Sequence, residues 1–325
     1  MKAFLLPSYG RLELADVPQP TPAAGEVLVR VRATSVQPYD WHFLRGEPRV
    51  ARLMGGGLGL RRPGIDILGA DVAGVVEAVG ADVTGFAEGD EVYAMPKRGG
   101  FASHVCVAAS EVVRKPRNLT FEQAAAVPMA AGTALLALDG TRPGHRVLVT
   151  GASGGVGTFA VQLAKTLGAT VTAVCGTRNV AMVGSLGADE VIDYSAEDFT
   201  RLGRRFDLLV DIAGNRPLSA CRRVLVRDGA FTIVGGPSGR WLRPVGRMVA
   251  ALATAPLVPQ RVTMADIVRC TTNRQNLTTL ASFIEDGKVT PVIDRTYPFD
   301  EIPAALAYQE TGHPSGKVVI SVNGS

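Results

Sequence analysis

Cysteine and histidine are scarce in this sequence, and neither is spaced to bind a metal ion. The four cysteines lie far apart and form no C-x-x-C pair, which argues against a zinc-ribbon lobe and favours a reducing compartment, the cytoplasm. The four histidines also stand singly, so we expect each to be structural or exposed. These residues are Cys106, Cys175, Cys221, Cys270, His42, His104, His145 and His313.

Long hydrophobic runs are missing as well. The longest apolar stretch, Met248 to Val258, contains Pro256 and is too short to cross a bilayer of about 30 Å. Near the N-terminus, Pro7 interrupts the sequence before the apolar core of a signal peptide can form. We therefore expect neither secretion nor a membrane span. The stretch 248–258 is interpreted as a helix packed on the protein or as an entrance flap.

A strong charge of one sign is also absent. The net charge is +4 and the sequence pI is about 9.0, an excess that suits small phosphate-bearing ligands but is too diffuse to indicate nucleic-acid binding. The chain has 325 residues, of which 46% are apolar and 20% charged. Because this length exceeds what one core usually supports, we expect a soluble protein with two domains.

The sequence does contain a glycine-rich turn between a predicted strand and a predicted helix. The apolar run 146–150 ends at Gly151, and apolar residues then recur at helical spacing up to Gly168. Glycines let a pyrophosphate approach the backbone N–H groups at a helix N-terminus, so the pattern predicts a dinucleotide site. A tight turn without a ligand is the alternative. The residues expected to hold the cofactor here are Gly151, Ser153, Gly154, Gly155, Val156 and Gly157.

The end of the next predicted strand, Thr170–Val174, indicates which dinucleotide binds. An NAD site normally has an acid at this place, whereas here no Asp or Glu lies between the start of the strand at Thr170 and Asp189. Arg178 can pair with a 2′-phosphate, which a carboxylate would repel. The sequence therefore predicts NADPH rather than NADH, unless Arg178 is an ordinary solvated residue at a helix start. The residues at this place are Gly176, Thr177, Arg178 and Asn179.

Strand and turn signals divide the chain into three stretches. Short strands predominate up to about Pro116, which indicates a distorted barrel, and strands alternate with helices from about Phe121 to Asp286, which indicates a doubly wound parallel sheet. The tail from Thr290, with a strand at Lys317–Val322, is too short for its own core. We predict an α/β protein with a β-rich domain at 1–118 and 287–325 and a Rossmann domain at 119–286. The other expected strands are Val27–Val31, Val72–Val79, Gly89–Val92, Phe101–Val107, Arg146–Thr150, Thr170–Val174, Glu190–Ile192, Phe206–Asp211 and Ala230–Val234.

This organisation resembles the medium-chain dehydrogenase/reductase superfamily. The stretches Gly69–Val76 and Gly89–Val92 are similar to motifs of its first domain. More narrowly, the Gly151–Gly157 turn, 175–179, Gly187–Asp189 and Val191–Tyr194 resemble the zinc-free, NADP-dependent quinone oxidoreductase group. The likeness covers nearly the whole chain, and it implies a GroES-like catalytic domain together with a Rossmann domain that binds NADPH.

The resemblance also implies that no metal ion takes part. Zinc alcohol dehydrogenases of this superfamily bind catalytic zinc through a Cys on a first-domain loop, a His in a G-H-E motif, and a Cys or acid near the start of the second domain. The matching positions here are Gln37, Ala70 and Met129. None supplies a thiolate or imidazole, so no Lewis acid is expected to polarise an alcohol.

Without a metal ion, the acceptor of the hydride must already be electrophilic. We predict hydride transfer from NADPH to a small hydrophobic quinone or α,β-unsaturated carbonyl. Gln37, where the family usually has Asn, can donate to a carbonyl oxygen, and Tyr39 can donate a proton or simply line the pocket. The alternative is an NADPH-binding redox sensor or scaffold with negligible turnover.

Further cofactor contacts and an assembly follow from the resemblance. Thr133 would reach toward the nicotinamide and Tyr194 toward the adenosine phosphate, although Tyr194 can also be a packing residue. Two strand ends would line the cofactor edge, unless their glycines only form turns. Pairing through an edge strand of the Rossmann sheet, here near Ala230–Val234, implies a homodimer. The strand-end residues are Ala213, Gly214, Asn215, Gly235 and Gly236.

Overall fold

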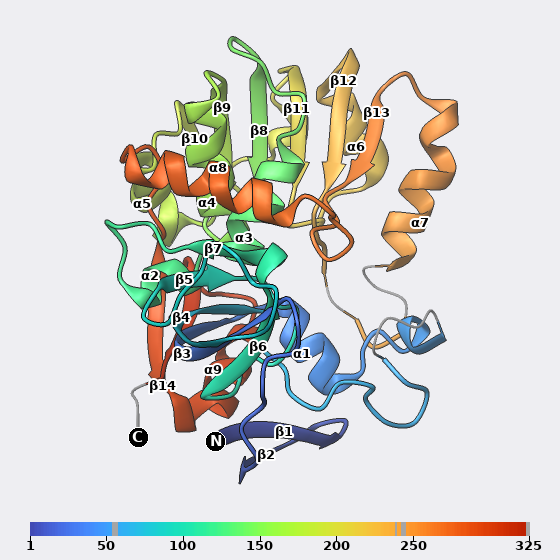
Figure 1. Ribbon diagram of the computed structural model, residues 1–325. Coiled ribbons are helices and arrows are strands. Elements are labelled where there is room, and N and C mark those ends of the chain that lie inside the picture. Colours follow the sequence, from blue (N-terminus) through green and yellow to red (C-terminus); the bar gives the residue numbers. More distant parts are fainter. Residues whose placement is uncertain (54–57, 238, 242–244, 323–325) are drawn as a thin grey trace. The chain divides into compact units, whose positions relative to one another are not determined.

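The computed structural model describes residues 1–53, 58–237, 239–241 and 245–322. These residues form two compact units (Figure 1). The first comprises Met1–Gly132, Cys270–Gly287 and Pro291–Ser325, and the second comprises Thr133–Arg269 and Lys288–Thr290. A β-rich unit and a parallel-sheet unit confirm the predicted fold class.

The first unit is built around a mixed sheet with the strand order β14-β15-β3-β4-β5-β7, in which β6 also pairs with β3. β14 and β15 run parallel, and the other neighbours run antiparallel. A separate hairpin joins β1 (Lys2–Ser8) to β2 (Arg11–Asp16). The sheet strands are β3 (Glu26–Val36), β4 (Asp71–Val79), β5 (Glu91–Ala94), β6 (His104–Ala108), β7 (Val112–Arg114), β14 (Ile293–Pro298) and β15 (Lys317–Ser321), and the helices are α1 (Pro38–Arg45), α2 (Phe121–Ala125), α8 (Asn273–Glu285) and α9 (Ile302–Glu310).

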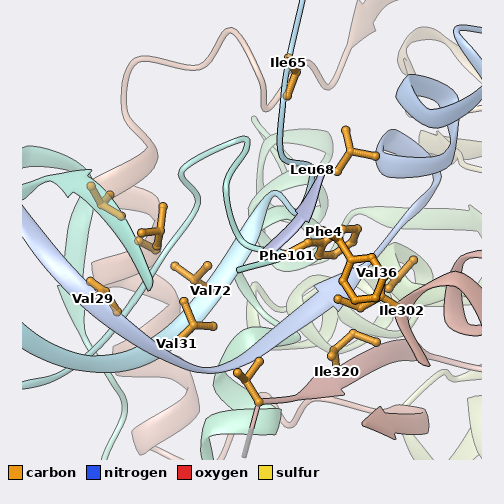
Figure 2. Packing of buried hydrophobic residues seen from close by; sticks show 14 of the residues in the cluster. Phe4, Val29, Val31, Val36, Ile65, Leu68, Val72, Phe101, Ile302 and Ile320 are labelled. Carbon is orange, nitrogen blue, oxygen red and sulfur yellow. The ribbon is translucent and has the colours of Figure 1, made fainter. Parts of the chain in front are cut away.

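The core of this unit lies against the long strand β3. Val29 and Val31 of β3 and Val72 of β4 belong to one buried cluster, which also takes in Phe4 and Ile320 (Figure 2). Because β15 pairs with β3, residues near the C-terminus complete a core that residues near the N-terminus begin. The tail therefore contributes the two strands β14 and β15 to the sheet of the first unit.

The second unit contains a parallel sheet with the strand order β10-β9-β8-β11-β12-β13. This is the order of a doubly wound dinucleotide-binding sheet, in which the chain runs outward from β8 in both directions. The middle of the central strand Arg146–Thr150, residues Val147, Leu148 and Val149, is apolar and buried, as expected for a parallel sheet covered on both faces. The strands are β8 (Arg146–Thr150), β9 (Thr170–Cys175), β10 (Glu190–Asp193), β11 (Phe206–Asp211), β12 (Leu225–Ile233) and β13 (Arg261–Met264), and the helices are α4 (Gly155–Thr166), α5 (Val180–Ser185), α6 (Leu218–Arg223) and α7 (Val245–Thr254), with α3 (Pro128–Ala137) leading in from the first unit.

The edge of this sheet is not where the sequence placed it. We expected an exposed edge near Ala230–Val234, but β12 is hydrogen-bonded on one side to β11 and on the other to β13, with Ala230 opposite Arg261. The prediction of an edge at β12 is therefore wrong: among the described residues, β13 is the edge strand on this side of the sheet and β10 on the other. β13 was missed because a strand of four residues directly after a proline-containing loop gives little periodic signal.

The apolar stretch 248–258 begins within α7, which ends at Thr254, and continues into a single turn of 3-10 helix, Ala255–Leu257. Ala251 is fully buried and Met248 packs on the core of the second unit, so the stretch is a helix packed on the protein, one of its two predicted forms. No helix in the described parts of the chain is long and apolar enough to cross a membrane.

The two units divide the chain differently from the predicted domains at 119–132 and 270–286. These residues pack with the first unit. The hydroxyl of the buried Tyr93 donates to the carbonyl oxygen of Leu277 in α8 at 2.6 Å, and the Asn118 amide donates to the carbonyl oxygen of Ile284 at 2.7 Å. These two hydrogen bonds hold α8 on the first unit. Helical periodicity alone does not predict which unit a helix packs against.

Candidate functional site

The glycine turn after β8 has the geometry of a dinucleotide-binding turn. Gly151 has φ +67°, a left-handed conformation that favours glycine, and the next N–H, of Ala152, donates to the carbonyl oxygen of Val174 at 3.0 Å. Gly154 then caps α4, and its carbonyl oxygen accepts from the N–H of Thr158. The first N–H groups of a helix have no acceptor within it, so the turn offers donors to an anion.

Gly157 is the most constrained residue of the turn. A Cβ atom at Gly157 would lie 2.1 Å from the carbonyl oxygen of Gly151 and 2.7 Å from the backbone of Ala152. At Gly154 the nearest atom would be 3.5 Å away, an ordinary contact. The need for glycine at Gly157 therefore comes from close packing of the helix on the turn, whereas packing does not require glycine at Gly154.

The predicted strand ends meet beside this turn. The Asp211 carboxylate accepts from the Thr150 hydroxyl at 2.8 Å and from the Gly214 N–H at 3.1 Å, which ties the end of β11 to the end of β8. A Cβ atom at Gly214 would lie 2.5 Å from the Cα of Gly236. The structure therefore brings the turn and both strand ends to one edge of the sheet, the carboxyl edge where such folds bind their ligands.

A second group of predicted residues surrounds the end of β9. Thr177 and Arg178 are exposed, and the hydroxyl oxygen of Tyr194, a residue 53% exposed, would lie 3.0 Å from a Cβ atom at Gly176. The hydroxyl of Thr177 and the N–H of Ser195 hold the pKa of Asp193 below its usual range. Tyr194 therefore covers Gly176, and Asp193 is a carboxylate of this region that our sequence reasoning did not single out.

The remaining predicted cofactor residues are placed by their elements alone. Thr133 is buried in α3, Ser153 and Val156 lie in or beside the glycine turn, and Asn179 ends a single turn of 3-10 helix after β9. Asn215 follows Gly214 and is exposed. Their contacts with a cofactor stay a prediction.

In the first unit, Gln37 lies within a buried polar cluster rather than on an open surface. Its Nε2 donates to Asp71 Oδ2 at 2.9 Å, and its Oε1 accepts from Lys317 Nζ at 3.0 Å. Asp71 Oδ2 also accepts from the Ser35 hydroxyl at 2.7 Å, and Oδ1 accepts from the Met129 N–H at 2.9 Å. One carboxylate therefore holds β3, the start of α1 and the start of α3 together.

Burial governs the charges of this cluster. Asp71 is 0% and Lys317 is 3% exposed. Burial raises the pKa of Asp71, and the ammonium of Lys317 opposes the rise. Burial likewise lowers the pKa of Lys317, which the carboxylate of Asp71 opposes. Each charge thus favours the ionised form of the other, at 3.7 Å between Nζ and Oδ2.

The start of α1 carries Tyr39, the other predicted catalytic residue, and Asp40. Pro38 opens the helix, and Asp40 accepts from the N–H of Gln37 at 3.0 Å and from the N–H of Gly69 at 3.1 Å. Burial raises the pKa of Asp40 to about 7, and burial raises that of Tyr39 to about 12. Asp40 therefore fixes the backbone of the loop that carries Gln37.

The residues at the metal-binding positions of the superfamily offer an amide, a methyl group and a thioether, from Gln37, Ala70 and Met129. A thiolate, imidazole or carboxylate is absent from this set. Within the described ranges, no three His, Cys, Asp or Glu side chains gather as a metal site would require.

The sequence reasoning overlooked Lys317, Asp71 and Asp211 as functional candidates. A signal for the first two exists, because each is a charged residue directly before an apolar run, Val72–Ala73 or Val318–Ile320, and a charge that is buried there needs a partner. The partner could not be named, since 246 positions separate Asp71 from Lys317 (317 − 71). Nothing in its pattern distinguishes Asp211 from other residues at strand ends.

Comparison with known proteins agrees with this architecture. Residues 23–117 match the family described as alcohol dehydrogenase GroES-like domain, and residues 186–320 match the family described as zinc-binding dehydrogenase. The GroES-like assignment of the first domain is thereby confirmed.

Individual relatives span almost the whole chain. The chloroplast envelope quinone oxidoreductase homolog of Arabidopsis thaliana is 36% identical over 98% of both chains. A second Arabidopsis thaliana protein, the chloroplastic NADPH-dependent alkenal/one oxidoreductase, is 32% identical, and the match covers 98% of this chain and 79% of that protein. The structure of the quinone oxidoreductase from Coxiella burnetii superposes with a TM-score of 0.85 at 30% identity and covers 99% of each chain. This protein is therefore an oxidoreductase of the medium-chain dehydrogenase/reductase superfamily and belongs to its quinone oxidoreductase group.

Proposed function

We propose that this enzyme transfers a hydride from NADPH to a quinone or an α,β-unsaturated carbonyl without the help of a metal ion. The observation that carries the proposal is the donor set at Gln37, Ala70 and Met129, which does not fit zinc. An alcohol cannot be activated there, whereas a conjugated carbonyl needs only a hydrogen-bond donor at its oxygen. The printed names of the two plant relatives, a quinone oxidoreductase homolog and an alkenal/one oxidoreductase, support the same acceptor classes.

In this proposal, residues of the second unit bind the cofactor and residues of the first unit orient the acceptor. Bound NADPH would supply the hydride. The Gly151–Gly157 turn would hold its pyrophosphate, and Gln37 would donate to the acceptor oxygen. We assign Tyr39 a role in lining the pocket, because a hydroxyl whose pKa is about 12 is a weak proton donor near neutral pH.

This function is tested by anaerobic oxidation of NADPH, with NADH in parallel, against para- and ortho-quinones, 2-alkenals and cyclic enones. We expect saturable turnover with NADPH and at least one of these acceptors. If NADPH binds tightly but no acceptor is turned over, the protein is instead a redox sensor or scaffold.

We propose NADPH rather than NADH because Arg178 is exposed at the end of β9 and pairs well with a phosphate. Arg178→Ala should raise the KM for NADPH about tenfold or more and leave the KM for NADH little changed, because only NADPH carries the 2′-phosphate. Arg201→Ala serves as the control, since Arg201 is another arginine of the second unit with an exposed side chain. Equal changes for both cofactors would remove this assignment.

The glycine turn generates a separate prediction. Gly157→Ala places a methyl group against the carbonyl oxygen of Gly151, so the turn must shift and the Kd for NADPH should rise at least about tenfold. Gly184→Ala is the matched control, because its Cβ would meet nothing closer than Val191 Cγ2 at 3.9 Å and alanine is the better helix former. Calorimetric titration measures both values, and unchanged affinity in Gly157→Ala would argue against the turn as the cofactor site.

We also propose a cytoplasmic homodimer. Free thiols at all four cysteines support the compartment, and the edge strand β13 supports pairing of two sheets. Light scattering should give twice the mass of the chain, and Met264→Lys, at a residue 37% exposed on β13, should shift it toward one chain. Leu14→Lys, at a residue 45% exposed on β2, should not. A wild-type mass of one chain contradicts the dimer.

A further inference from the structure

We infer that Lys317 is a positioning residue: with Asp71, it fixes the side-chain amide of Gln37 in one orientation, so that Gln37 can offer a substrate an N–H and never its oxygen. The inference rests on the proposed function, in which Gln37 contacts the acceptor. It adds a specificity determinant, because such a site recognises an atom that accepts hydrogen bonds.

The two ends of the amide meet opposite charges. Oε1 of Gln37 lies 3.0 Å from the ammonium of Lys317, and Nε2 lies 2.9 Å from the carboxylate of Asp71. An ammonium can only donate and a carboxylate can only accept. Turning the amide over would place its oxygen against the carboxylate and its NH₂ group against the ammonium, and both hydrogen bonds would become repulsions.

Burial makes this discrimination strong. The exposed fractions of Gln37, Lys317 and Asp71 are 5%, 3% and 0%, so water does not replace a lost partner. In such surroundings charge-assisted hydrogen bonds are strengthened, and an unsatisfied polar group is costly. The flipped amide is therefore excluded, and the orientation of Gln37 is a fixed property of the folded first unit.

Strand register explains how distant residues reach the same amide. β3 ends just before Gln37, and at this end its neighbours are β15 and β4. Val36 is paired with Val318 on one side, and Ser35 is paired with Asp71 on the other. Lys317 and Asp71 therefore flank the end of β3, and the sheet itself delivers the two charges.

One hydrogen of the amide is left for a substrate. Nε2 carries two hydrogens, and within residues 1–53, 58–237, 239–241 and 245–322 the structure gives it the single acceptor Asp71. The second hydrogen is the group that Gln37 can present. A carbonyl oxygen, which gains negative charge during reduction, is the acceptor that such a fixed donor stabilises.

We call the two hydrogen bonds that fix the Gln37 amide, one from Lys317 and one to Asp71, the lock. Loss of the Lys317 ammonium should release it. Burial raises the pKa of Asp71 and Lys317 opposes that rise, so without Lys317 the carboxyl becomes more readily protonated. A protonated carboxyl both donates and accepts, and it therefore no longer distinguishes the two ends of the Gln37 amide. Lys317→Met should accordingly leave Gln37 in two orientations.

The test compares a ketone with an alkene of the same shape. Binding of cyclohexanone and of methylenecyclohexane to the NADP⁺-saturated protein is measured by ligand-observed NMR. The wild type should prefer the ketone about tenfold or more, because only its oxygen accepts the N–H. Lys317→Met should reduce the preference to about twofold or less and lower kcat for the best acceptor about tenfold to a hundredfold, with the KM for NADPH unchanged.

Two further variants complete the design. Lys115→Met is the matched control. Lys115 also lies in the first unit, directly after β7; its side chain is 6% exposed, and its ammonium pairs with Glu91 of β5. The ketone preference should persist in this variant. If Lys317→Met does not fold, Asp71→Asn/Lys317→Met removes both charges of this ion pair, so that neither of the two is left without the other. An asparagine also donates and accepts, so the preference should again be lost.

The outcomes separate this inference from the proposed function. Wild-type turnover of enones together with an unchanged ketone preference in Lys317→Met overturns the lock and keeps the function. A preference that depends on Lys317 in a protein that reduces no acceptor keeps the lock and removes the function. A wild type that does not prefer the ketone overturns the lock outright.

Discussion

The buried carboxylate of Asp71 is the constraint on which the first unit depends. Removing a carboxylate from water costs several kcal/mol unless charge and hydrogen bonds replace the solvent, and Asp71 has no exposed surface. Its partners come from β3, the start of α1, α3 and β15. Satisfying one carboxylate therefore requires that strands from both ends of the chain be in register, and the same requirement positions Gln37.

In the second unit, close backbone approaches shape the carboxyl edge of the sheet, and Arg247 pairs with the buried carboxylate of Asp211 there. Gly157 and Gly214 allow the turn and the neighbouring strand ends to approach within distances that side chains would forbid. The Thr150 hydroxyl donates to the Asp211 carboxylate and accepts from the N–H groups of Ile212 and Ala213, which holds the ends of β8 and β11 in line. This is the edge at which doubly wound parallel sheets bind their ligands. In the proposed function, discrimination between NADPH and NADH falls to the side chains after β9, where Arg178 lies.

Features that depend on local chemistry could be predicted from the sequence, and features that depend on distant partners could not. The strands from Arg146 to Asp211 and the turn at Gly151 follow from β-branched runs and from the steric needs of glycine. The short edge strand β13 and the attachment of α8 to Tyr93 depend on tertiary contacts. Gln37 was found through the resemblance, but its partner Lys317 was not, because 280 positions separate them and no periodicity links residues so far apart.

The division of the first unit between the two ends of the chain has a consequence for biosynthesis. The ribosome makes Met1–Gly132 first, then the whole of Thr133–Arg269, and only afterwards the segments that return to the first unit. Until Lys317 leaves the ribosome, the nascent chain holds Asp71 without its ammonium and β3 without its neighbour β15. The parallel-sheet unit, contiguous apart from three residues (288–290), can thus fold during translation, whereas the unit whose synthesis begins first is the last to become native.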